Sequence, residues 1–432
     1  MKTIAVIGCG RIANNAHFPA FEKMENVRVK YACDVIKEKA EAAKVKFPKI
    51  ENVITDYKVA LGDKEVEAVW VLTPNYAHYT ITMDALKAGK HVMCEKPITI
   101  NYELSRKMAE MAEKQGKILN IGVCNRHHKS VELIADMVKT GKLGNIYHVY
   151  CSFRSNRSIP GLGGAFTTKS QSGGGVLIDW GVHFFDLIFY VLGSVKLKTV
   201  TCDAYNEMAK DMKLYKYNFM WAEDTADTEH GTNDVDDFIS GYIRTNKASI
   251  SFNGAWAQNI PEEEMFIDFM GDRGGVRLQY GGQFEYFDGE TLTVENSSHE
   301  IPNMYQEENK AFLNSIDSGK KDKNNVGYVL ETAKLLELLY LNENATKKDS
   351  AEYEEYTMSE FAAAYPAEAK KIDSLRKAVL FGGFVSAGSG TTDNCFIVEG
   401  VGTGNGIELV SSCGFNELKW NYLTRLHDSV YA

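Results

Sequence analysis

The stretch Thr3-Ile-Ala-Val-Ile-Gly-Cys-Gly-Arg-Ile-Ala13 decides the fold of this chain. Its first five residues are small or branched and mostly apolar, which predicts a buried strand of a parallel sheet. Gly8, Gly10 and Ala13 then form a G-x-G-x-x-A motif, and residues 12–24 have the apolar spacing of a helix. Strand, glycine turn and helix in this order predict a dinucleotide-binding unit. Gly8 permits the turn, Gly10 lets a pyrophosphate approach the backbone, and Ala13 allows close packing.

The helix that begins after this turn offers unpaired backbone N–H groups to the phosphates of a cofactor. Asp34 follows the second predicted strand, residues 27–32, where the motif places an acid for the ribose 2′-hydroxyl. Because an acid there would repel a 2′-phosphate, NAD is favoured over NADP, although Lys37 lies close enough to favour NADP. Asp34 could instead only cap the helix predicted over residues 36–47. The predicted cofactor contacts of this unit are Gly8, Gly10, Arg11, Ile12, Ala13 and Asp34.

Strands and helices alternate through the first 125 residues. Further strands are expected over residues 67–72, 91–94 and 118–123, and helices over residues 79–88 and 103–115. This alternation predicts an α/β domain with a doubly wound parallel sheet, the Rossmann architecture. Ligands of such sheets bind beyond the carboxyl ends of the strands. The polar residues at those ends complete the predicted cofactor contacts: Thr73, Asn75, His78, Glu95, Lys96 and Asn125.

From residue 126 onward the pattern changes. Alternating apolar and polar residues at 146–153 and between 236 and 287 predict an α+β domain with a large, mostly antiparallel open sheet. Two amphipathic helices, residues 305–318 and 326–342, are expected to finish it. An insertion at 205–232, rich in Tyr, Trp and Asp, is expected to lie over the site or to contact another subunit. The predicted divisions are a dinucleotide-binding domain (1–125), a substrate and oligomerisation domain (126–357) and an extension of unassigned role (358–432).

The segment Gly175–Leu192 is predicted to be a largely apolar helix that carries Asp179 and His183. Residues four apart share one face of a helix, and ionisable side chains on a buried helix need a partner or a function. The two could be a satisfied core pair, but the polar loop at 154–174 leads directly into the helix and favours a site. The predicted substrate contacts are Lys96, Arg126, Arg154, Asn156, Arg157, Asp179, Trp180 and His183.

Composition limits the possible partners. The 432 residues carry a formal net charge of −10 without a basic tract, which argues against nucleic acids and anionic membranes. Eight cysteines without a C-x-x-C pair argue against a zinc knuckle, and the adjacent His127 and His128 would point to opposite faces of a strand, so no metal is expected. A cytoplasmic protein is expected for three reasons. The cysteines are spaced as free thiols, the N-terminal strand leaves no room for a signal peptide, and no apolar run reaches about 18 residues.

Three motifs together resemble the Gfo/Idh/MocA family of glucose–fructose oxidoreductases and inositol dehydrogenases. They are the Gly8–Ala13 turn, Glu95-Lys-Pro97 and Gly175…Asp179-Trp-Gly-Val-His183, and they cover a pattern that extends over roughly residues 1 to 350. The resemblance implies NAD(P)-dependent oxidation or reduction at a CH–OH carbon of a sugar or cyclitol. It also implies that Lys96 is catalytic, that Asp179 and His183 complete the site, and that subunits form homodimers or homotetramers through the sheet.

Within that family, residues 161–168 together with Gly122-Val-Cys-Asn-Arg126 are similar to bacterial enzymes that oxidise the 3-hydroxyl of glucosides. Three other functions remain open at this point. The chain could be an inositol dehydrogenase, an NAD-dependent glycosidase that acts through transient oxidation at C3, or an NAD-binding sensor without turnover.

Oxidising a secondary alcohol requires a base within hydrogen-bond reach of the hydroxyl while hydride leaves the same carbon. His183 has a suitable side chain for the base, with Asp179 orienting it or a neighbouring hydroxyl and Lys96 polarising the reacting oxygen. The alternative makes Lys96 the base, because burial can make a lysine neutral.

Overall fold

The computed structural model describes residues 1–217, 219–297, 299 and 302–346. The chain divides into two compact units, Met1–Glu343 and Asn344–Ala432. The extension predicted at 358–432 and the domain end at 357 lie outside the described residues. The first unit holds both predicted sheets.

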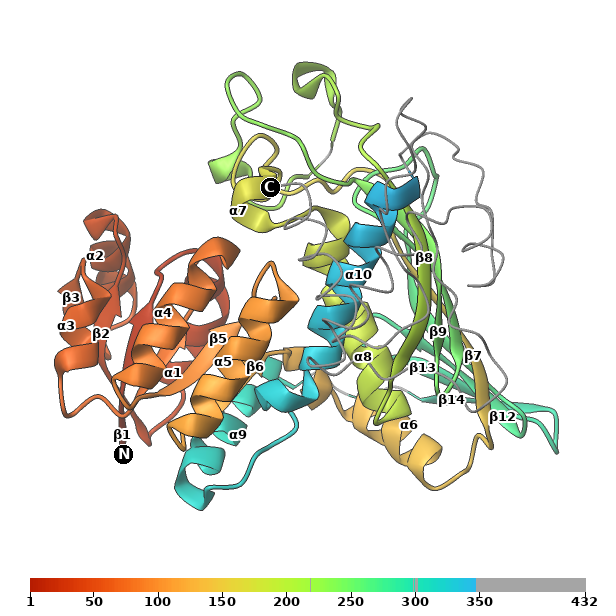
Figure 1. The fold of residues 1–432 in the computed structure, drawn as a ribbon, viewed down its shortest axis with the longest axis horizontal. Coiled ribbons are helices and arrows are strands. Elements are labelled where there is room, and N and C mark those ends of the chain that lie inside the picture. The colour runs from red at the N-terminus through yellow and green to blue at the C-terminus, as the bar shows by residue number, and fades with distance from the viewer. Residues whose placement is uncertain (218, 298, 300–301, 347–432) are drawn as a thin grey trace, which may run out of the picture. The chain divides into compact units, whose positions relative to one another are not determined.

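The first sheet is parallel and has six strands in the order β3-β2-β1-β4-β5-β6 (Figure 1). This is the doubly wound order expected from the glycine turn. The strands are β1 (Lys2–Ile7), β2 (Val27–Cys33), β3 (Ile50–Ile54), β4 (Ala68–Val71), β5 (His91–Glu95) and β6 (Leu119–Gly122). Strand β3 was not expected, because Glu51 and Asn52 interrupt its apolar residues. It is an edge strand in which only Ile50 is buried.

The helices that connect these strands along the chain pack on the faces of the sheet. They are α1 (Phe18–Glu22), α2 (Lys37–Lys46), α3 (Tyr57–Gly62), α4 (Asn75–Lys87) and α5 (Tyr102–Lys114), with a π-helical turn η1 (Ala13–His17) before α1. Side-chain caps explain where two of them begin: the Asp56 carboxylate accepts a hydrogen bond from Lys58 N, and the Asn101 side chain accepts one from Leu104 N.

The second sheet has eight strands in the order β14-β13-β12-β11-β7-β10-β9-β8. All of its pairings are antiparallel except that of β7 with β10. Its strands are β7 (Ile146–Arg154), β8 (Leu197–Tyr205), β9 (Phe238–Thr245), β10 (Ser249–Ala255), β11 (Glu264–Gly271), β12 (Gly274–Gln279), β13 (Phe284–Asp288) and β14 (Thr293–Ser297). Strands β8 and β14 were not expected; most of their residues are exposed, so their apolar periodicity is weak.

One face of this sheet is covered by α6 (Lys129–Lys139), α8 (Val182–Leu192) and α10 (Leu330–Thr346) (Figure 1). Buried residues of these helices and of the strands form one core, with Phe153 stacked on Phe184 and edge-on to Phe185. Short elements connect these parts: η2 (Cys124–His127), α7 (Lys169–Ser172), η3 (Leu177–Gly181), η4 (Met212–Leu214), η5 (Glu223–Thr225) and η6 (Val326–Tyr328).

The predicted helix 175–192 is not a uniform α-helix. It opens with the π-helical turn η3 and continues as α8. The longer stretch Lys169–Leu192 has the length and composition of a membrane span, although the sequence was expected to contain no apolar run of that length. However, 78 % of its most apolar window is buried inside the protein, so the fold itself uses this apolar surface.

Helix α9 (Met304–Ser318) packs against the first sheet and not with the second domain as expected. The indole Nε1 of Trp70 in β4 donates a hydrogen bond of 2.8 Å to Asn309 Oδ1, and Phe312 contacts the same indole edge-on. The chain therefore returns to the Rossmann domain after completing the second sheet, and carries Tyr305 and Glu308 to it.

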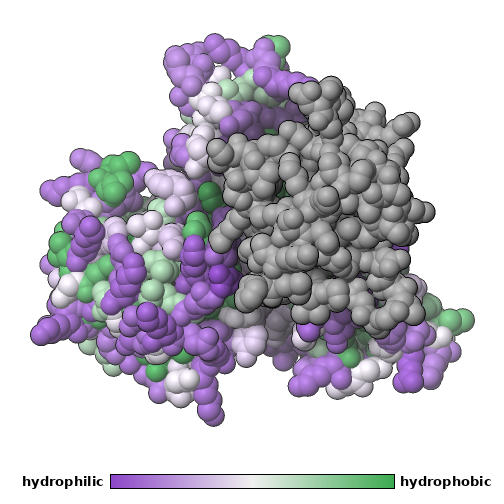
Figure 2. Space-filling model, in the orientation of Figure 1, coloured by the Kyte–Doolittle hydropathy of each residue, from purple (hydrophilic) through white to green (hydrophobic). Residues whose placement is uncertain are grey.

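The surface of the Rossmann domain that faces the viewer in Figure 2 is mostly hydrophilic, with hydrophobic residues scattered among the polar ones. Exposed apolar side chains such as Val35 and Val45 are of this scattered kind. Single exposed apolar residues are ordinary on a globular protein and mark no partner.

Candidate active site

The glycine turn has the shape that a dinucleotide requires. Gly8 has φ +100°, and a Cβ there would lie 2.5 Å from Leu72 O, so only glycine fits. A Cβ on Gly10 would meet nothing within 4 Å, which leaves open space against its backbone. Ala13 is fully buried where the turn enters the first helical segment. Open space over a glycine backbone at the carboxyl end of a parallel strand fits a pyrophosphate.

Asp34 lies beside this turn, as predicted. Its Oδ2 accepts a hydrogen bond of 2.9 Å from Cys9 N, and its Oδ1 accepts one of 2.9 Å from Ile36 N. The second bond closes a local turn before α2, whose N-cap residue is Ile36 without a side-chain cap, so Asp34 does not cap that helix. Lys37, the residue that favoured NADP, has its ammonium 3.0 Å from Glu41.

The polar residues at the end of β4 divide into two kinds. Thr73 Oγ1 is a buried polar atom without a hydrogen-bond partner, which suits contact with a bound group. Asn75 Nδ2 donates a hydrogen bond of 2.7 Å to Ser172 O and so joins the two domains. His78 is 1 % exposed, and its two ring nitrogens lie 2.8 Å from Thr73 O and Pro97 O. His78 therefore connects the loops after β4 and β5 inside the protein, and is not the cofactor contact that its place after the strand suggested.

The ring of His78 holds these two carbonyl groups best when it is protonated, because both nitrogens can then donate. Burial opposes this charge, but the neighbouring Cys94 sulfur and the two carbonyls outweigh it and raise the pKa of His78 to about 9. The loop that follows β5 is thereby tied to the loop that follows β4.

Lys96 and Asp179 meet across the domain boundary. Lys96 Nζ lies 3.2 Å from Asp179 Oδ1 and donates to Asp179 O at 3.3 Å, and both side chains are partly exposed. The lysine comes from the end of β5 and the carboxylate from η3, 83 residues later. The two ends of the predicted site are therefore brought together.

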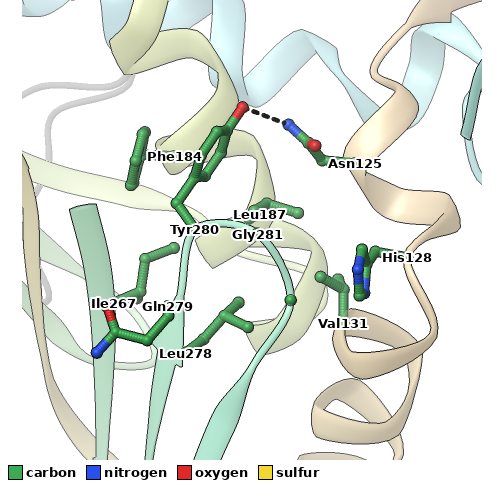
Figure 3. Close-up of a pocket in the computed structure, with 11 residues that line it drawn as sticks. Asn125, His128, Val131, Phe184, Leu187, Ile267, Leu278, Gln279, Tyr280 and Gly281 are labelled. Atoms are coloured by element: carbon green, nitrogen blue, oxygen red, sulfur yellow. Dashed lines mark hydrogen bonds between the residues drawn. The ribbon is translucent and has the colours of Figure 1, made fainter. Parts of the chain in front are cut away.

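His183 is held by a different partner. Its Nδ1 lies 3.2 Å from Asn125 Nδ2, and the same amide nitrogen donates a hydrogen bond of 3.1 Å to the hydroxyl of Tyr280. Figure 3 shows this hydroxyl and the Asn125 amide facing one another, with Phe184 beside the tyrosine ring. The cavity behind them measures about 20 Å³, enough for one water and too small for a sugar. Asn125 was predicted to bind the cofactor; here its amide holds the imidazole.

The imidazole of His183 is held in its neutral form. Burial, and then the positive charge of Lys96, lower its pKa well below the ordinary value near 6.5. No hydrogen bond joins Asp179 to His183 in the described part of the chain, although they are four residues apart. The π-helical turn at Leu177–Gly181 accounts for this, because it has more residues per turn than an α-helix and shifts Asp179 relative to α8.

Arg126 is not at the site, contrary to the prediction. Its side chain is 2 % exposed and makes two hydrogen bonds to Asp186, Nε to Oδ2 at 2.7 Å and Nη2 to Oδ1 at 2.6 Å. It also donates to the backbone oxygens of Lys323 and Tyr328. The guanidinium is therefore a buried connection between η2, α8 and the segment before α10.

Two of the three polar residues predicted at the start of the loop bind within the second domain. Arg154 pairs with Glu264 of β11, and Arg157 donates to Asn156 O, Gln258 O and Asn259 Oδ1. Arg154 also lines an open cavity of about 330 Å³ with Tyr205, Glu207, Met208, Asp237, Phe238, Ala257, Gln258, Asn259 and Ile260. None of these residues contacts Lys96 or His183 among the described hydrogen bonds. Trp180 stays beside Asp179 on η3 and packs partly on the core.

The insertion at 205–232 reaches the glycine turn. Arg11 pairs with Asp224, and its guanidinium lies 5.4 Å from the centre of the Trp221 ring. Gly161 N donates to Trp221 O at 2.8 Å, so the insertion and the glycine-rich loop are joined. Of the two expectations for this insertion, a position next to the cofactor turn is the one that the contacts support.

Sequence reasoning missed four residues around the site: Tyr280, Asp186, His17 and Glu308. Tyr280 follows β12 and supports Asn125, and Asp186 is one turn beyond His183 on α8. The His17 side chain is fully buried, with Nε2 2.9 Å from Glu95 Oε1. The only sequence signal for Asp186 was a carboxylate within an apolar helix, and nothing in the sequence linked Glu308 to the site.

Comparisons with known proteins agree with this geometry. Residues 2–123 match the model of the Gfo/Idh/MocA oxidoreductase family with an NAD-binding Rossmann fold, and residues 131–277 match the C-terminal domain of the same family. The D-glucoside 3-dehydrogenase of Escherichia coli (strain K12) is 29 % identical over 315 residues, which is 72 % of this chain and 87 % of the relative.

Two further relatives extend the comparison. The scyllo-inositol 2-dehydrogenase (NADP(+)) of Bacillus subtilis (strain 168) is 26 % identical over 49 % of this chain and 58 % of the relative. The structure of a levoglucosan dehydrogenase in complex with NADH and levoglucosan has a TM-score of 0.67 at 18 % identity, covers 80 % of this chain and 97 % of its own, and shows the shared fold. The two domain matches and the strand-end site together show that this chain belongs to the Gfo/Idh/MocA family and is an NAD(P)-dependent dehydrogenase.

Proposed function

We propose that this dehydrogenase oxidises a secondary hydroxyl of a sugar, glycoside or cyclitol, with the 3-hydroxyl of a glucoside as the preferred target. The observation that carries the proposal is the ion pair between Lys96, at the carboxyl end of β5, and Asp179. Burial and the positive charge of Lys96 also lower the pKa of His183. The D-glucoside 3-dehydrogenase relative supports the glucoside, because it is similar over most of both chains.

In the mechanism we infer, the Lys96 ammonium, oriented by Asp179, donates a hydrogen bond to the reacting oxygen and stabilises the alkoxide as it forms. His183 takes the hydroxyl proton on Nε2 when the Asn125 amide presents its oxygen to Nδ1–H, because Nε2 carries no hydrogen in that tautomer. Bound nicotinamide dinucleotide supplies the hydride acceptor. The carbinol carbon loses a hydride, its hydroxyl oxygen loses a proton to His183, and the two atoms become a carbonyl group.

The orientation of the Asn125 amide selects which tautomer the neutral His183 imidazole adopts. With its nitrogen toward Nδ1, the amide favours hydrogen on Nε2, and Nε2 of this tautomer cannot accept the hydroxyl proton. Turned by 180°, the amide presents its oxygen to Nδ1–H and leaves Nε2 free to accept a proton during oxidation. Tyr280 is compatible with both orientations, because a hydroxyl can donate or accept.

We infer a preference for NAD from the Asp34 carboxylate beside the turn. Replacing Asp34 with serine should lower kcat/KM for NAD and raise it for NADP, because the repulsion of a 2′-phosphate is removed. Equal use of NAD and NADP by the unmodified protein would contradict the inference.

The experiment that tests the function is incubation of the full chain with NAD and methyl glucoside, free glucose and myo-inositol, followed by absorbance at the NADH band and product analysis. Reduced cofactor with a 3-keto-glucoside supports the proposal, and turnover of inositol alone supports an inositol dehydrogenase. Release of the aglycone identifies the glycosidase alternative, and no turnover of any polyol identifies a sensor.

Assembly and location are parts of the same proposal. We propose a homodimer or homotetramer through the face of the eight-stranded sheet opposite α6, α8 and α10, which no helix of the described residues covers. We propose a cytoplasmic location because the six cysteines among the described residues are free thiols, all buried. Light scattering and cell fractionation test the two statements.

A further inference from the structure

Three buried ionisable side chains form a cluster that contacts the backbone of Lys96 through Glu95. His17 comes from η1, Glu95 from β5 and Glu308 from α9, and their exposures are 0 %, 5 % and 0 %. One nitrogen or oxygen atom of each lies within 4.8 Å of those of the other two. The mechanism above uses none of the three, although Glu95 precedes Lys96 in the chain.

Most polar atoms of this cluster already have partners. Glu95 Oε1 lies 2.9 Å from His17 Nε2, and Glu95 Oε2 accepts a hydrogen bond of 3.0 Å from Lys96 N. Glu308 Oε1 accepts one of 2.8 Å from Asn324 Nδ2. The two buried atoms without a partner are His17 Nδ1 and Glu308 Oε2. One ring nitrogen and one carboxyl oxygen are therefore left without a partner.

Two carboxylates this close, away from water, cannot both be ionised at low cost. Burial alone would raise the pKa of Glu95, but the hydrogen bond from His17 and the charges of His17 and Lys96 lower it below its usual range. Burial raises the pKa of Glu308 well above its usual range, and the charges of Glu95, Asp322 and Asp186 raise it further. The proton therefore belongs on Glu308.

We propose that Glu308 is a neutral carboxylic acid in the working enzyme. Glu308 and His17 are then positioning residues: they leave Glu95 as the single ionised carboxylate of the cluster and hold it next to Lys96. Glu95 in turn holds the Lys96 backbone through its N–H, so the cluster fixes where β5 ends. A Cβ on Gly122 of the neighbouring strand would lie 2.9 Å from the Glu95 carboxyl carbon, which shows how tightly the carboxylate is enclosed. The role in turnover rests on the proposed function; the protonation state does not.

A bound divalent cation is the other way to stabilise two buried carboxylates beside an imidazole. Both oxygens of Glu95 already accept hydrogen bonds, and so does Glu308 Oε1. A cation held by His17 Nε2 would displace the hydrogen bond between this nitrogen and Glu95 Oε1, whereas a proton on Glu308 Oε2 displaces none. The geometry therefore favours the proton.

The test compares Glu308→Gln, which has the shape of the protonated acid, with Glu95→Gln, in the full chain. The matched control is Glu307→Gln on the same helix, where the carboxylate pairs with Lys310 at the surface. The first readout is the infrared C=O band of a protonated carboxylic acid at neutral pH. We expect this band in the unmodified protein and in Glu307→Gln, and its loss in Glu308→Gln. Its absence from the unmodified protein overturns the proposal even if no substrate is known.

The second readout is the pH dependence of kcat with the sugar found to react. Glu308→Gln should retain kcat within about twofold and leave the profile in place, because no charge is removed. Glu95→Gln should move the profile by about one pH unit or more, as expected for the loss of a charge so close to Lys96. A shift in Glu308→Gln as large as that in Glu95→Gln shows an ionised Glu308 and overturns the proposal. So does stoichiometric metal in the purified protein that Glu308→Gln lacks.

Discussion

Replacing Arg126 with methionine should destabilise this enzyme strongly without changing how it binds its sugar. The guanidinium and the Asp186 carboxylate are each 2 % exposed and share two hydrogen bonds of 2.6 and 2.7 Å. The substitution leaves a buried carboxylate whose remaining hydrogen bond, from Thr332 Oγ1, is long at 3.4 Å. Breaking one partner of a buried pair costs about 3–5 kcal/mol.

The assay is urea unfolding followed by fluorescence and circular dichroism. With an m value of about 3 kcal/mol per M, this loss lowers the midpoint by about 1 to 1.7 M. The double variant Arg126→Met with Asp186→Leu should recover part of the loss, because no charge is then left unpaired. Arg28→Met removes a surface arginine that pairs with Glu51 and Glu65, and serves as the control with the smaller shift.

The refuting result concerns both stability and substrate. If Arg126→Met keeps the midpoint of the unmodified protein and raises the sugar KM more than about tenfold, Arg126 faces substrate, as its place after β6 first suggested. A KM within about twofold in the folded variant supports the structural role.

The remaining predictions concern the site and its pH dependence. Lys96→Met and His183→Ala should each lower kcat by about 10²–10⁴-fold while NADH binding, measured by fluorescence, is retained; wild-type rates in both would remove the proposed roles. Gly122→Ala should push the Glu95 carboxylate away from Lys96 and lower kcat about tenfold, with a stability loss of about 1–3 kcal/mol; unchanged kcat and melting temperature would argue against a tight enclosure. The raised pKa of His78, about 9, means that its contribution to stability is present below pH ~6.5 and is lost as the pH rises toward 9, so His78→Gln should flatten the alkaline limb of the melting curve. Burial and the charges of Lys117 and Lys2 lower the pKa of His91 to about 4. The contribution of His91 to the free energy of unfolding is therefore lost as the pH falls from ~6.5 toward 4. His91→Gln should remove this pH dependence, which amounts to at most about 1.4 kcal/mol per pH unit.

The parts of the fold that sequence predicted are those set by local chemistry. The strand before Gly8, the glycine turn and the strand that ends at Glu95 were predicted because apolar runs and glycines act within a few residues. Strands β3, β8 and β14 were missed because an edge strand with exposed residues has no clear apolar period. Helix α9 has an amphipathic pattern, but the pattern does not say which of two sheets its apolar face covers.

The sequence predicted which residues lie at the ends of the parallel strands but not which side chains they contact, and the reason is chain separation. Parallel strands end at one edge of a sheet, so a residue at such an end is near the ligand whatever its side chain does next. What the side chain does depends on segments far along the chain: Asn125 is held by Tyr280, 155 residues later, and Arg126 is paired with Asp186, 60 residues later. One polar residue beyond β6 therefore contacts His183, while its neighbour pairs with Asp186 of α8. Adjacent residues with opposite roles follow from this geometry, because consecutive side chains leave a tight turn in different directions. The strand ends consequently identify which loops form the site, and the residues that act within those loops are decided by the second domain.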